Sequence, residues 1–160
     1  MSTYKIRLEI EAETLKRRDP KGYEKVLKVG EQVLQLFQSY VMKQDTNSLR
    51  GLLLKAQQKD PNINFLKTNE GGKLFATAAA RGFVDILKLF IEEFGFDPDL
   101  RAPEEQTALM VACYAGEVKT VLYLLGRNAN PNATDSYKKT PLHYATDELF
   151  KDYAANPEKK

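Results

Sequence analysis

Apolar residues in the middle of the chain recur at spacings of three and four, which is the period of one buried face of an α-helix. In two stretches the apolar positions fall five, eight and nine residues after a glycine: Leu87, Phe90 and Ile91 after Gly82, and Val121, Leu124 and Leu125 after Gly116. The same distances lead from Gln44 to Leu49, Leu52 and Leu53, if Gln44 takes the place of the glycine. The pattern therefore predicts three amphipathic helices, each preceded by a turn.

Two of these predicted helices follow a segment that also repeats, and a third copy of that segment lies further along the chain. Residues 73–82 align with residues 107–116, at an offset of 34, and these align with residues 140–146, at an offset of 33. Strings rich in Asn, Asp and Pro, which stop helices and favour turns, connect the units at 60–64, 96–99 and 128–132. The repeating unit is thus a helix, a tight turn, a second helix and an extended loop.

Residues 140–145 have the sequence TPLHYA, which matches the Thr-Pro-Leu-His-x-Ala string of the ankyrin repeat, whose period is about 33 residues. On this string, the period and the loop composition, the chain resembles the ankyrin-repeat family over residues 44 to 147. The resemblance implies an all-α fold, a solenoid of stacked helix-turn-helix units. Lys73 and Leu74 depart from it by replacing Thr-Pro, and Phe94 is a one-residue insertion that accounts for the offset of 34.

The chain divides, on this interpretation, into a stack at 44–153 with further segments at both ends. The stack consists of a degenerate first unit at 44–68, repeats at 69–102 and 103–135, and a truncated last unit at 136–153. A polar tail follows at 154–160. The last unit lacks the expected glycine and paired leucines, which is typical of a terminal cap or of a surface completed by a partner.

Upstream of the stack, residues 21–43 predict one long helix of roughly 33 Å, docked on the first repeat as an N-terminal cap. Its apolar side chains follow three- and four-residue spacings: Tyr23, Val26, Leu27, Gly30, Val33, Leu34, Phe37, Tyr40 and Val41. The preceding arm, residues 1–20, alternates apolar and charged residues from Tyr4 to Glu11, which is strand periodicity. A helix with Lys5–Glu9 and Arg7–Glu11 pairs competes with the strand. We expect this arm to bind a partner, since a strand would have no evident mate within the chain.

Several residue choices within the repeats suit stacked helices. Small side chains permit adjacent first helices to approach closely, and they are Ala78, Ala79, Ala112 and Cys113. Thr107 and Thr140 precede short helices, where a hydroxyl accepts a hydrogen bond from a free backbone N–H. Asn128 takes the place where the family usually has glycine, and asparagine tolerates the left-handed conformation that the turn requires.

Residues that suggest chemistry have structural explanations in this context. The family resemblance gives His143, the only histidine, a hydrogen-bonding role between repeats, and Cys113 is expected to be a buried small side chain. The segment 71–73 lacks the spacing of a phosphate-binding loop and predicts a hairpin turn. The acidic and basic doublets are interpreted as solvated surface and solubilising termini: Glu92-Glu93, Glu104-Glu105, Arg17-Arg18 and Lys159-Lys160. We therefore expect no enzyme activity, no metal and no cofactor.

Charge and composition narrow the class of partner. The formal net charge of +2 gives no footprint of a nucleic-acid-binding protein. No apolar run approaches the ~20 residues of a membrane span, so no membrane insertion is expected. A single cysteine favours a reducing compartment, and we expect an intracellular, cytoplasmic protein, with organelle import by an internal signal left open.

The family resemblance implies binding through loop tips and through the concave face of the first helices. Carried onto this sequence, the candidate protein-binding residues are Asn69, Glu70, Ala80, Arg81, Pro103, Glu104, Gln106, Tyr114, Ala115, Ser136, Tyr137 and Lys139. Tyr114 and Tyr137 are the expected central anchors, because tyrosine is enriched at binding hot spots. Arg81 and Lys139 are expected to pair with acidic groups of the partner. The sequence thus predicts an interaction module that binds a protein or a multiprotein complex rather than a small-molecule substrate. It would act as a scaffold or accessory subunit or, alternatively, as an inhibitor that occludes an enzyme such as a kinase.

Overall fold

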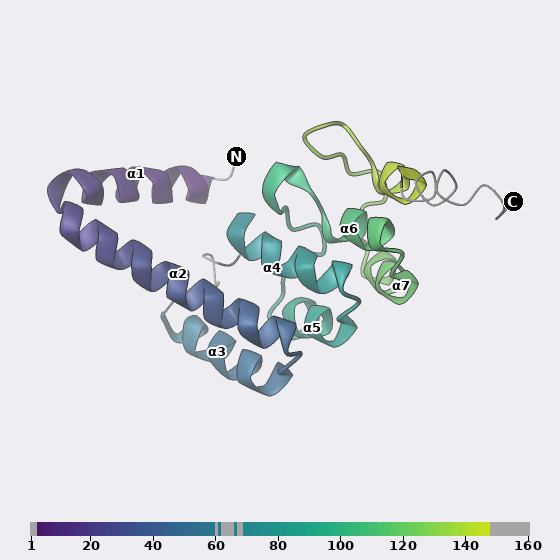
Figure 1. Cartoon of the computed structure of the whole chain (residues 1–160), viewed down its shortest axis with the longest axis horizontal. Coiled ribbons are helices and arrows are strands. Elements are labelled where there is room, and N and C mark those ends of the chain that lie inside the picture. The colour runs from purple at the N-terminus through teal and green to yellow at the C-terminus, as the bar shows by residue number, and fades with distance from the viewer. Residues whose placement is uncertain (1–2, 60, 62–65, 67–68, 148–160) are drawn as a thin grey trace, which may run out of the picture. The chain divides into compact units, whose positions relative to one another are not determined.

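The computed structural model describes residues 3–59, 61, 66 and 69–147, and in this part of the chain the regular structure is helical, without β-strands (Figure 1). The chain forms two compact units, residues 1–39 and residues 40–160. The expected polar tail at 154–160 and the end of the truncated last unit lie outside the described residues.

The first unit contains α1, Thr3–Arg18, and most of α2, Pro20–Met42. Asp19 separates the two helices. Its carboxylate accepts a hydrogen bond from the N–H of Gly22 at 3.0 Å, and its carbonyl accepts one from the N–H of Tyr23 at 2.9 Å. An aspartate before a proline is a favourable start for a helix, because the carboxylate satisfies a free N–H and Pro20 has no N–H to leave unpaired.

The arm at 1–20 is a helix over almost its whole length, so the strand suggested by its alternating pattern is wrong and the competing helix is right. A strand needs a neighbour to pair its backbone groups, whereas a helix satisfies them internally. The last turn of α1 carries Lys16, Arg17 and Arg18, and cations are favourable near the negative end of a helix.

The apolar stripe of α2 is buried only towards its C-terminal end. Phe37 and Val41 are fully buried, whereas Val26 is 61% exposed and Leu27 is 47% exposed. Gly30 is exposed as well. That this helix docks on the first repeat as an N-terminal cap stays a prediction.

The second unit consists of paired helices connected by loops (Figure 1). After α3, Thr46–Lys59, come α4, Asn69–Ala80, and α5, Val84–Lys88, which continues into a π-helical turn, η2, Leu89–Glu93. A 3₁₀ turn, η3, Pro103–Glu105, precedes the pair α6, Ala108–Ala115, and α7, Val118–Gly126. Residues 141–147 are also helical. The first helices α4 and α6 pack side by side, as do the second helices α5 and α7.

Three turns in the second unit have the same backbone geometry. Gly82, Gly116 and Gln44 adopt left-handed conformations with φ of 74°, 71° and 53°. In each turn, the N–H of the next residue donates a hydrogen bond of 2.9–3.0 Å to the carbonyl five residues earlier: Phe83 to Ala78, Glu117 to Ala112, and Asp45 to Tyr40. These are Schellman-type helix ends. Gln44 therefore stands at the glycine position, and the end of α2 with α3 forms a helix pair like the two that follow.

The core of the second unit lies between the two helices of each pair. Its largest members include Phe75, Phe90 and Phe96, whose rings contact one another at centroid distances of 6.2 and 4.9 Å. Ala78, Ala79 and Ala112 are fully buried where α4 and α6 meet. A π-helical turn holds one residue more than an α-helical turn, and η2 ends directly before Phe94, the residue that we identified as an insertion.

Gly71 and Gly72 lie within α4, so the hairpin turn that we predicted at 71–73 is wrong. Both glycines are buried against other backbone. A Cβ at Gly71 would lie 1.6 Å from the carbonyl oxygen of Leu66, and one at Gly72 would lie 2.1 Å from that of Arg101. The glycines are therefore explained by the close approach of other backbone segments of this chain to the start of α4, and not by turn geometry.

Candidate protein-binding surface

Two finger-like loops project from the repeats before α6 and before the helix at 141–147. Each is closed by one backbone hydrogen bond, from Ala102 N–H to the Gln106 carbonyl at 2.8 Å and from Asp135 N–H to the Lys139 carbonyl at 3.0 Å. The N–H of Ser136 donates to the carbonyl of Glu104 at 2.9 Å and joins the two fingers. The fingers are thus held in register along the stack.

The second finger is fixed by Asp135, which is only 6% exposed. Its carboxylate accepts hydrogen bonds from the N–H groups of Tyr137 and Lys139 at 2.8 and 2.9 Å and from the hydroxyl of Tyr144 at 2.5 Å. Burial opposes ionisation of Asp135, but these hydrogen bonds outweigh it and lower the pKa of the carboxyl. Burial, together with the adjacent carboxylate, raises the pKa of Tyr144 to about 12.

The two expected anchor tyrosines are both exposed, Tyr114 by 41% and Tyr137 by 66%. Tyr114 lies near the end of α6, and its ring meets the ring of Tyr144 edge-to-face at a centroid distance of 6.5 Å. Gln106 donates its side-chain amide to the hydroxyl of Tyr144 at 3.1 Å. Tyr144, which we did not single out, thereby connects a finger residue with a helix-face residue. Its place in the x position of TPLHYA was the available signal.

The other candidate residues divide into exposed and restrained side chains. Arg81, Pro103, Glu104, Ala115 and Ser136 are exposed, and Ala80 is half-buried. Lys139 is already paired within the chain, since its Nζ lies 2.9 Å from Oδ2 of Asp147. The side chains of Asn69 and Glu70 lie outside the described residues, although their backbone begins α4.

The threonines before the first helices cap them as expected. The hydroxyl of Thr107 accepts from Met110 N–H at 3.3 Å, and that of Thr140 accepts from His143 N–H at 3.4 Å. Nδ1 of His143 accepts from the N–H of Thr140 at 3.0 Å, so the imidazole closes the first turn of its own helix. Asn128 adopts the left-handed conformation, with φ of 64°.

The doublet Glu92-Glu93 is not merely solvated surface. Glu93 forms a two-pronged ion pair with Arg50 of α3, with N–O distances of 2.7 and 2.8 Å. Glu92 pairs with Arg127, which follows α7. The hydrogen bond with Arg50 is the main cause that lowers the pKa of Glu93. The repeat at 69–102 thus forms ion pairs with the units before and after it, through two adjacent carboxylates.

Cys113 is a free thiol that is half-buried rather than fully buried, and burial raises its pKa. A raised pKa leaves less of the reactive thiolate at neutral pH. Among the described residues, no three His, Cys, Asp or Glu side chains gather closely enough to hold a metal ion. None of the helices in the described part of the chain has the length and hydropathy that crossing a bilayer demands.

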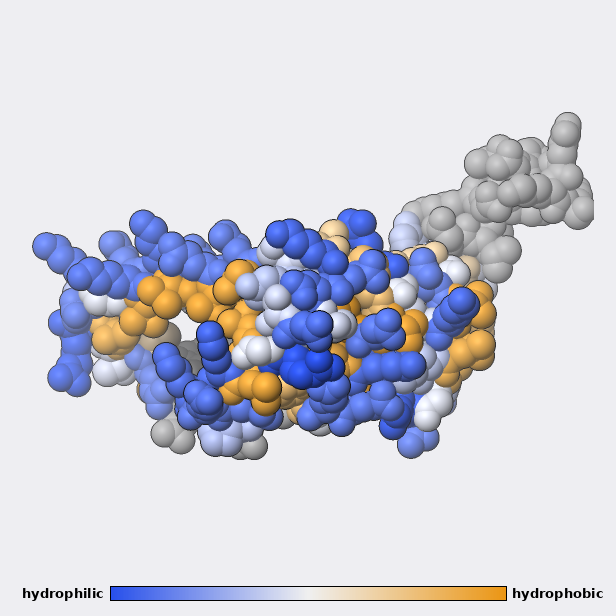
Figure 2. Space-filling model, turned by 90° about the horizontal axis from the view of Figure 1, so that it is seen from below, coloured by the Kyte–Doolittle hydropathy of each residue, from blue (hydrophilic) through white to orange (hydrophobic). Residues whose placement is uncertain are grey.

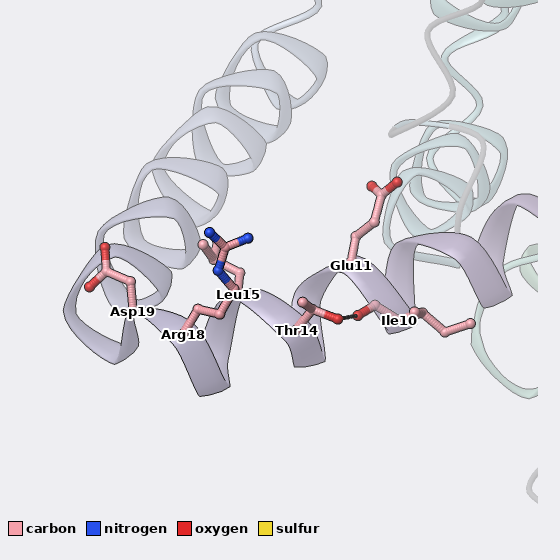
Figure 3. Close-up of a pocket in the computed structure, with 6 residues that line it drawn as sticks. All are labelled: Ile10, Glu11, Thr14, Leu15, Arg18 and Asp19. Atoms are coloured by element: carbon pink, nitrogen blue, oxygen red, sulfur yellow. Dashed lines mark hydrogen bonds between the residues drawn. The ribbon is translucent and has the colours of Figure 1, made fainter.

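A surface hollow of about 580 Å³ lies beside α1 (Figure 3). The side chains that line it are of mixed chemistry, two acidic, one basic, one hydroxyl and two aliphatic: Glu11, Asp19, Arg18, Thr14, Ile10 and Leu15. The Thr14 hydroxyl is occupied, since it donates to the carbonyl of Ile10 at 2.7 Å. This mixed lining provides no paired catalytic groups.

Sequence reasoning missed an apolar edge on α7. Figure 2 shows hydrophobic surface gathered at this end of the molecule. It comprises Val118, Leu122 and Leu125, which are 66%, 64% and 41% exposed and lie at spacings of four and three. Leu53 and Ile91, the equivalents of Leu125 in the earlier repeats, are fully buried and half-buried. The missing leucines of the last unit were the signal that this edge would be uncovered.

Comparison with known proteins agrees with this architecture. A family model described as "Ankyrin repeats (3 copies)" matches residues 39–135 and 74–154. A protein of Arabidopsis thaliana named "Putative E3 ubiquitin-protein ligase XBAT31" is 42% identical over 69 residues, which are 42% of this chain and 15% of that protein. The chain thus spans only a small part of this relative. Because the family match covers more than half of the chain, the chain belongs to the ankyrin-repeat family.

Proposed function

We propose that this chain binds another protein through the surface formed by its two fingers and the exposed ends of α4 and α6. Ankyrin repeats are protein–protein interaction modules. The observation that supports this surface is the placement of Tyr114, Tyr144 and Gln106 in one contacting group beside the exposed Tyr137 finger. Aromatic side chains on a rigid support lose little conformational freedom on binding.

The two fingertips carry opposite charges, which favours a partner whose acidic and basic groups lie in separate patches. The first fingertip carries exposed Glu104 and Glu105, whereas the second carries exposed Lys138. Arg81 is exposed at the end of α4 and is available to an acidic group. Lys139 contributes less than expected, because a partner carboxylate would have to displace Asp147.

Within a cell, we propose the role of a non-catalytic scaffold or accessory subunit in the cytoplasm. The match covers only 15% of the Arabidopsis relative, so the ubiquitin ligation in that protein's name is not carried over to this chain. An affinity pull-down with chemical cross-linking would separate a subunit from an enzyme inhibitor. Stoichiometric recovery in a stable complex supports a subunit, and recovery of one enzyme that loses activity on addition of the chain contradicts it.

The surface is tested by the double variant Tyr114→Ala/Tyr137→Ala in a binding assay with the recovered partner. Loss of hot-spot tyrosines typically weakens binding by about tenfold or more each. Leu122→Ala is the matched control, because Leu122 is also a large exposed side chain but lies on α7, outside the surface. Unchanged affinity of the double variant, with circular dichroism equal to that of the parent, would reject the surface.

A further inference from the structure

The apolar side chains Val118, Leu122 and Leu125, which we call the α7 edge, are exposed at the last described second helix of the stack. In the preceding repeat, α5 packs against α7, so the second helix of one repeat is covered by that of the next. Leu142 is uncovered in the same way, since it is 71% exposed whereas its equivalent Leu109 is 2% exposed. The described part of the last unit therefore lacks the chain that would cover α7.

The sequence that continues beyond the described residues carries large apolar side chains of its own. Residues 148–153 read ELFKDY, and Leu149, Phe150 and Tyr153 have the spacing of one helical face. They are not the apolar stripe of a regular repeat. The positions one period of 33 residues after the stripe of α7 hold Ala154, Pro157 and Glu158. The segment therefore offers apolar cover, but several residues earlier than the repeat pattern would place it.

The turns of successive repeats indicate where this segment begins. A Cβ at Gly82 would lie 2.5 Å from Oε2 of Glu117, so the turn after α4 touches the turn after α6. One repeat further along the chain, the corresponding positions are Gly116 and Phe150. Val118 follows Gly116 by two residues, and Phe150 follows the described helix at 141–147 by three. The repeat geometry thus brings Phe150 to the N-terminal end of the α7 edge.

Charge favours this segment over a second copy of the chain as the occupant of the α7 edge. α7 carries exposed Lys119 and contains no acid, so two copies placed edge to edge would bring like charges together. Glu148 and Asp152 lie one helical turn apart in the segment and leave it acidic in spite of Lys151. A segment tethered this closely also has an effective concentration of about millimolar, which a separate molecule does not reach at ordinary protein concentrations.

We propose that residues 148–153 fold back onto the α7 edge and cover it with Leu149, Phe150 and Tyr153, with the acids of the segment towards Lys119. The cover comes from the residues that directly follow the first helix of the last unit and not from a second helix of repeat spacing. The chain closes its own stack in this way, and a protein that binds the α7 edge must first displace the segment. This contact is separate from the finger surface and does not depend on it.

Disulfide trapping in the full chain tests the contact. In a Cys113→Ser background, Val118→Cys/Phe150→Cys is oxidised with copper phenanthroline and analysed by non-reducing electrophoresis and mass spectrometry. We expect a disulfide within one molecule, since the bond needs two Cα atoms within about 7 Å. Leu54→Cys/Phe150→Cys is the matched control and should stay reduced, because Leu54 is also exposed but lies on α3. A first variant that stays reduced or forms a covalent dimer, or equal oxidation of both variants, would overturn the proposal.

Hydrogen exchange tests the same contact without new cysteines. In Leu149→Ser/Phe150→Ser, the amides of α7 should exchange about tenfold faster or more, since a helix that has lost its apolar cover opens more often. Exchange in α3 should not change. Ala154→Ser/Ala155→Ser is the control, because it alters two apolar residues that follow the segment directly. Equal exchange of α7 in the parent and in Leu149→Ser/Phe150→Ser would show that the segment does not cover this helix.

A labelled peptide with the sequence of residues 147–155 separates cover by the chain's own segment from an edge that is free for other molecules. Fluorescence anisotropy follows its binding to the parent chain and to Leu149→Ser/Phe150→Ser. We expect the peptide to bind the variant and to bind the parent at least about tenfold more weakly, because the tethered segment competes for the same edge. Equal binding to both chains would contradict the proposal. Because Tyr114 and Tyr137 are unchanged in these experiments, the result does not bear on the finger surface.

Discussion

Gln44 occupies a backbone position that two other repeats give to glycine. Its φ of 53° lies in the left-handed region, where a Cβ crowds the following carbonyl and costs roughly 1–2 kcal/mol. The turn is retained because the hydrogen bonds of Gln44 and Asp45 to the end of α2 satisfy carbonyls that would otherwise have no partner. A side chain with no advantage in that conformation therefore stores strain at the first helix junction.

Gln44→Gly should raise the free energy of unfolding by about 1 kcal/mol, since glycine adopts this conformation without the Cβ crowding. Urea denaturation monitored by circular dichroism measures the change. Gln44→Ala is the control, because it removes the amide but keeps the Cβ. Equal stabilisation by both substitutions would show that the strain is not in the backbone.

Asp135 and Tyr144 make the stability of the last finger depend on pH at both extremes. Because the folded pKa of Asp135 is lowered, its contribution is present above the ordinary carboxyl pKa and is lost as the pH falls through the folded value. The contribution of Tyr144 to stability depends on pH in the opposite direction. Its pKa is raised to about 12, so its contribution is present below the ordinary value of 10.0 and is lost as the pH rises from there towards 12.

The variant Tyr144→Phe isolates the alkaline effect. The parent should be more stable than the variant at pH 8, because phenylalanine cannot donate to Asp135, and the difference should shrink progressively above pH 10. Urea denaturation at a series of pH values measures the difference. A difference that stays constant up to pH 11.5 would mean that the hydroxyl titrates alike in the folded and unfolded states.

At the scale of elements, the helices could be predicted from the sequence because each has a short-range cause. The spacing of Leu87, Phe90 and Ile91, the capping threonines and the left-handed Asn128 all depend on residues within one or two turns. What could not be predicted depends on how the backbone folds back on a helix. Gly71 and Gly72 suggested a turn by composition, but their role is set by the close approach of the Leu66 backbone, five residues away, and of the Arg101 backbone, far along the sequence.

The candidate surface shows the same division. Exposure of Tyr137 follows from its place in a loop between helix pairs, and this the repeat pattern locates. The pair of Lys139 with Asp147 depends on how the finger loop folds against the helix at 141–147. The contact of Tyr114 with Tyr144 depends on how helices of two different repeats are oriented, and spacing alone defines neither. In α1, alternation over eight residues suggested a strand, but the backbone groups of a lone segment are satisfied only in a helix.

The glycine pair provides the test at this scale. Gly72→Ala should destabilise the fold by about 1–3 kcal/mol, because its Cβ would meet the backbone of Arg101 at 2.1 Å and one of the two elements must move. Gly51→Ala is the matched control. Gly51 lies within α3 with open space around its Cβ, so alanine should stabilise by roughly 0.5–1 kcal/mol. Thermal or urea denaturation distinguishes the two, and a neutral Gly72→Ala would contradict the close approach.

At the scale of the whole molecule, the apolar side chains at equivalent positions of the second unit become less buried from one repeat to the next towards the C-terminus. At equivalent positions Leu53 is fully buried, Ile91 is half-buried and Leu125 is 41% exposed. Leu142 is 71% exposed. In a stack each repeat contacts only its neighbours, so local stability is the sum of a repeat's own stability and its interfaces. A gradient of burial should therefore appear as a gradient of local opening.

Hydrogen exchange of the native chain measures this gradient directly. Amides of α4 and α6, beside the buried Ala79 and Ala112, should exchange slowest, and amides of the helix at 141–147 should exchange first, because its opening exposes little additional apolar surface. Leu124→Ala adds a second arm. Leu124 is fully buried in α7, and its truncation leaves a cavity that costs about 2–5 kcal/mol. Exchange should accelerate strongly in α6 and α7 and little in α3, since coupling decays along a stack. Equal acceleration from α3 to α7 would instead show that these helices unfold as one cooperative body.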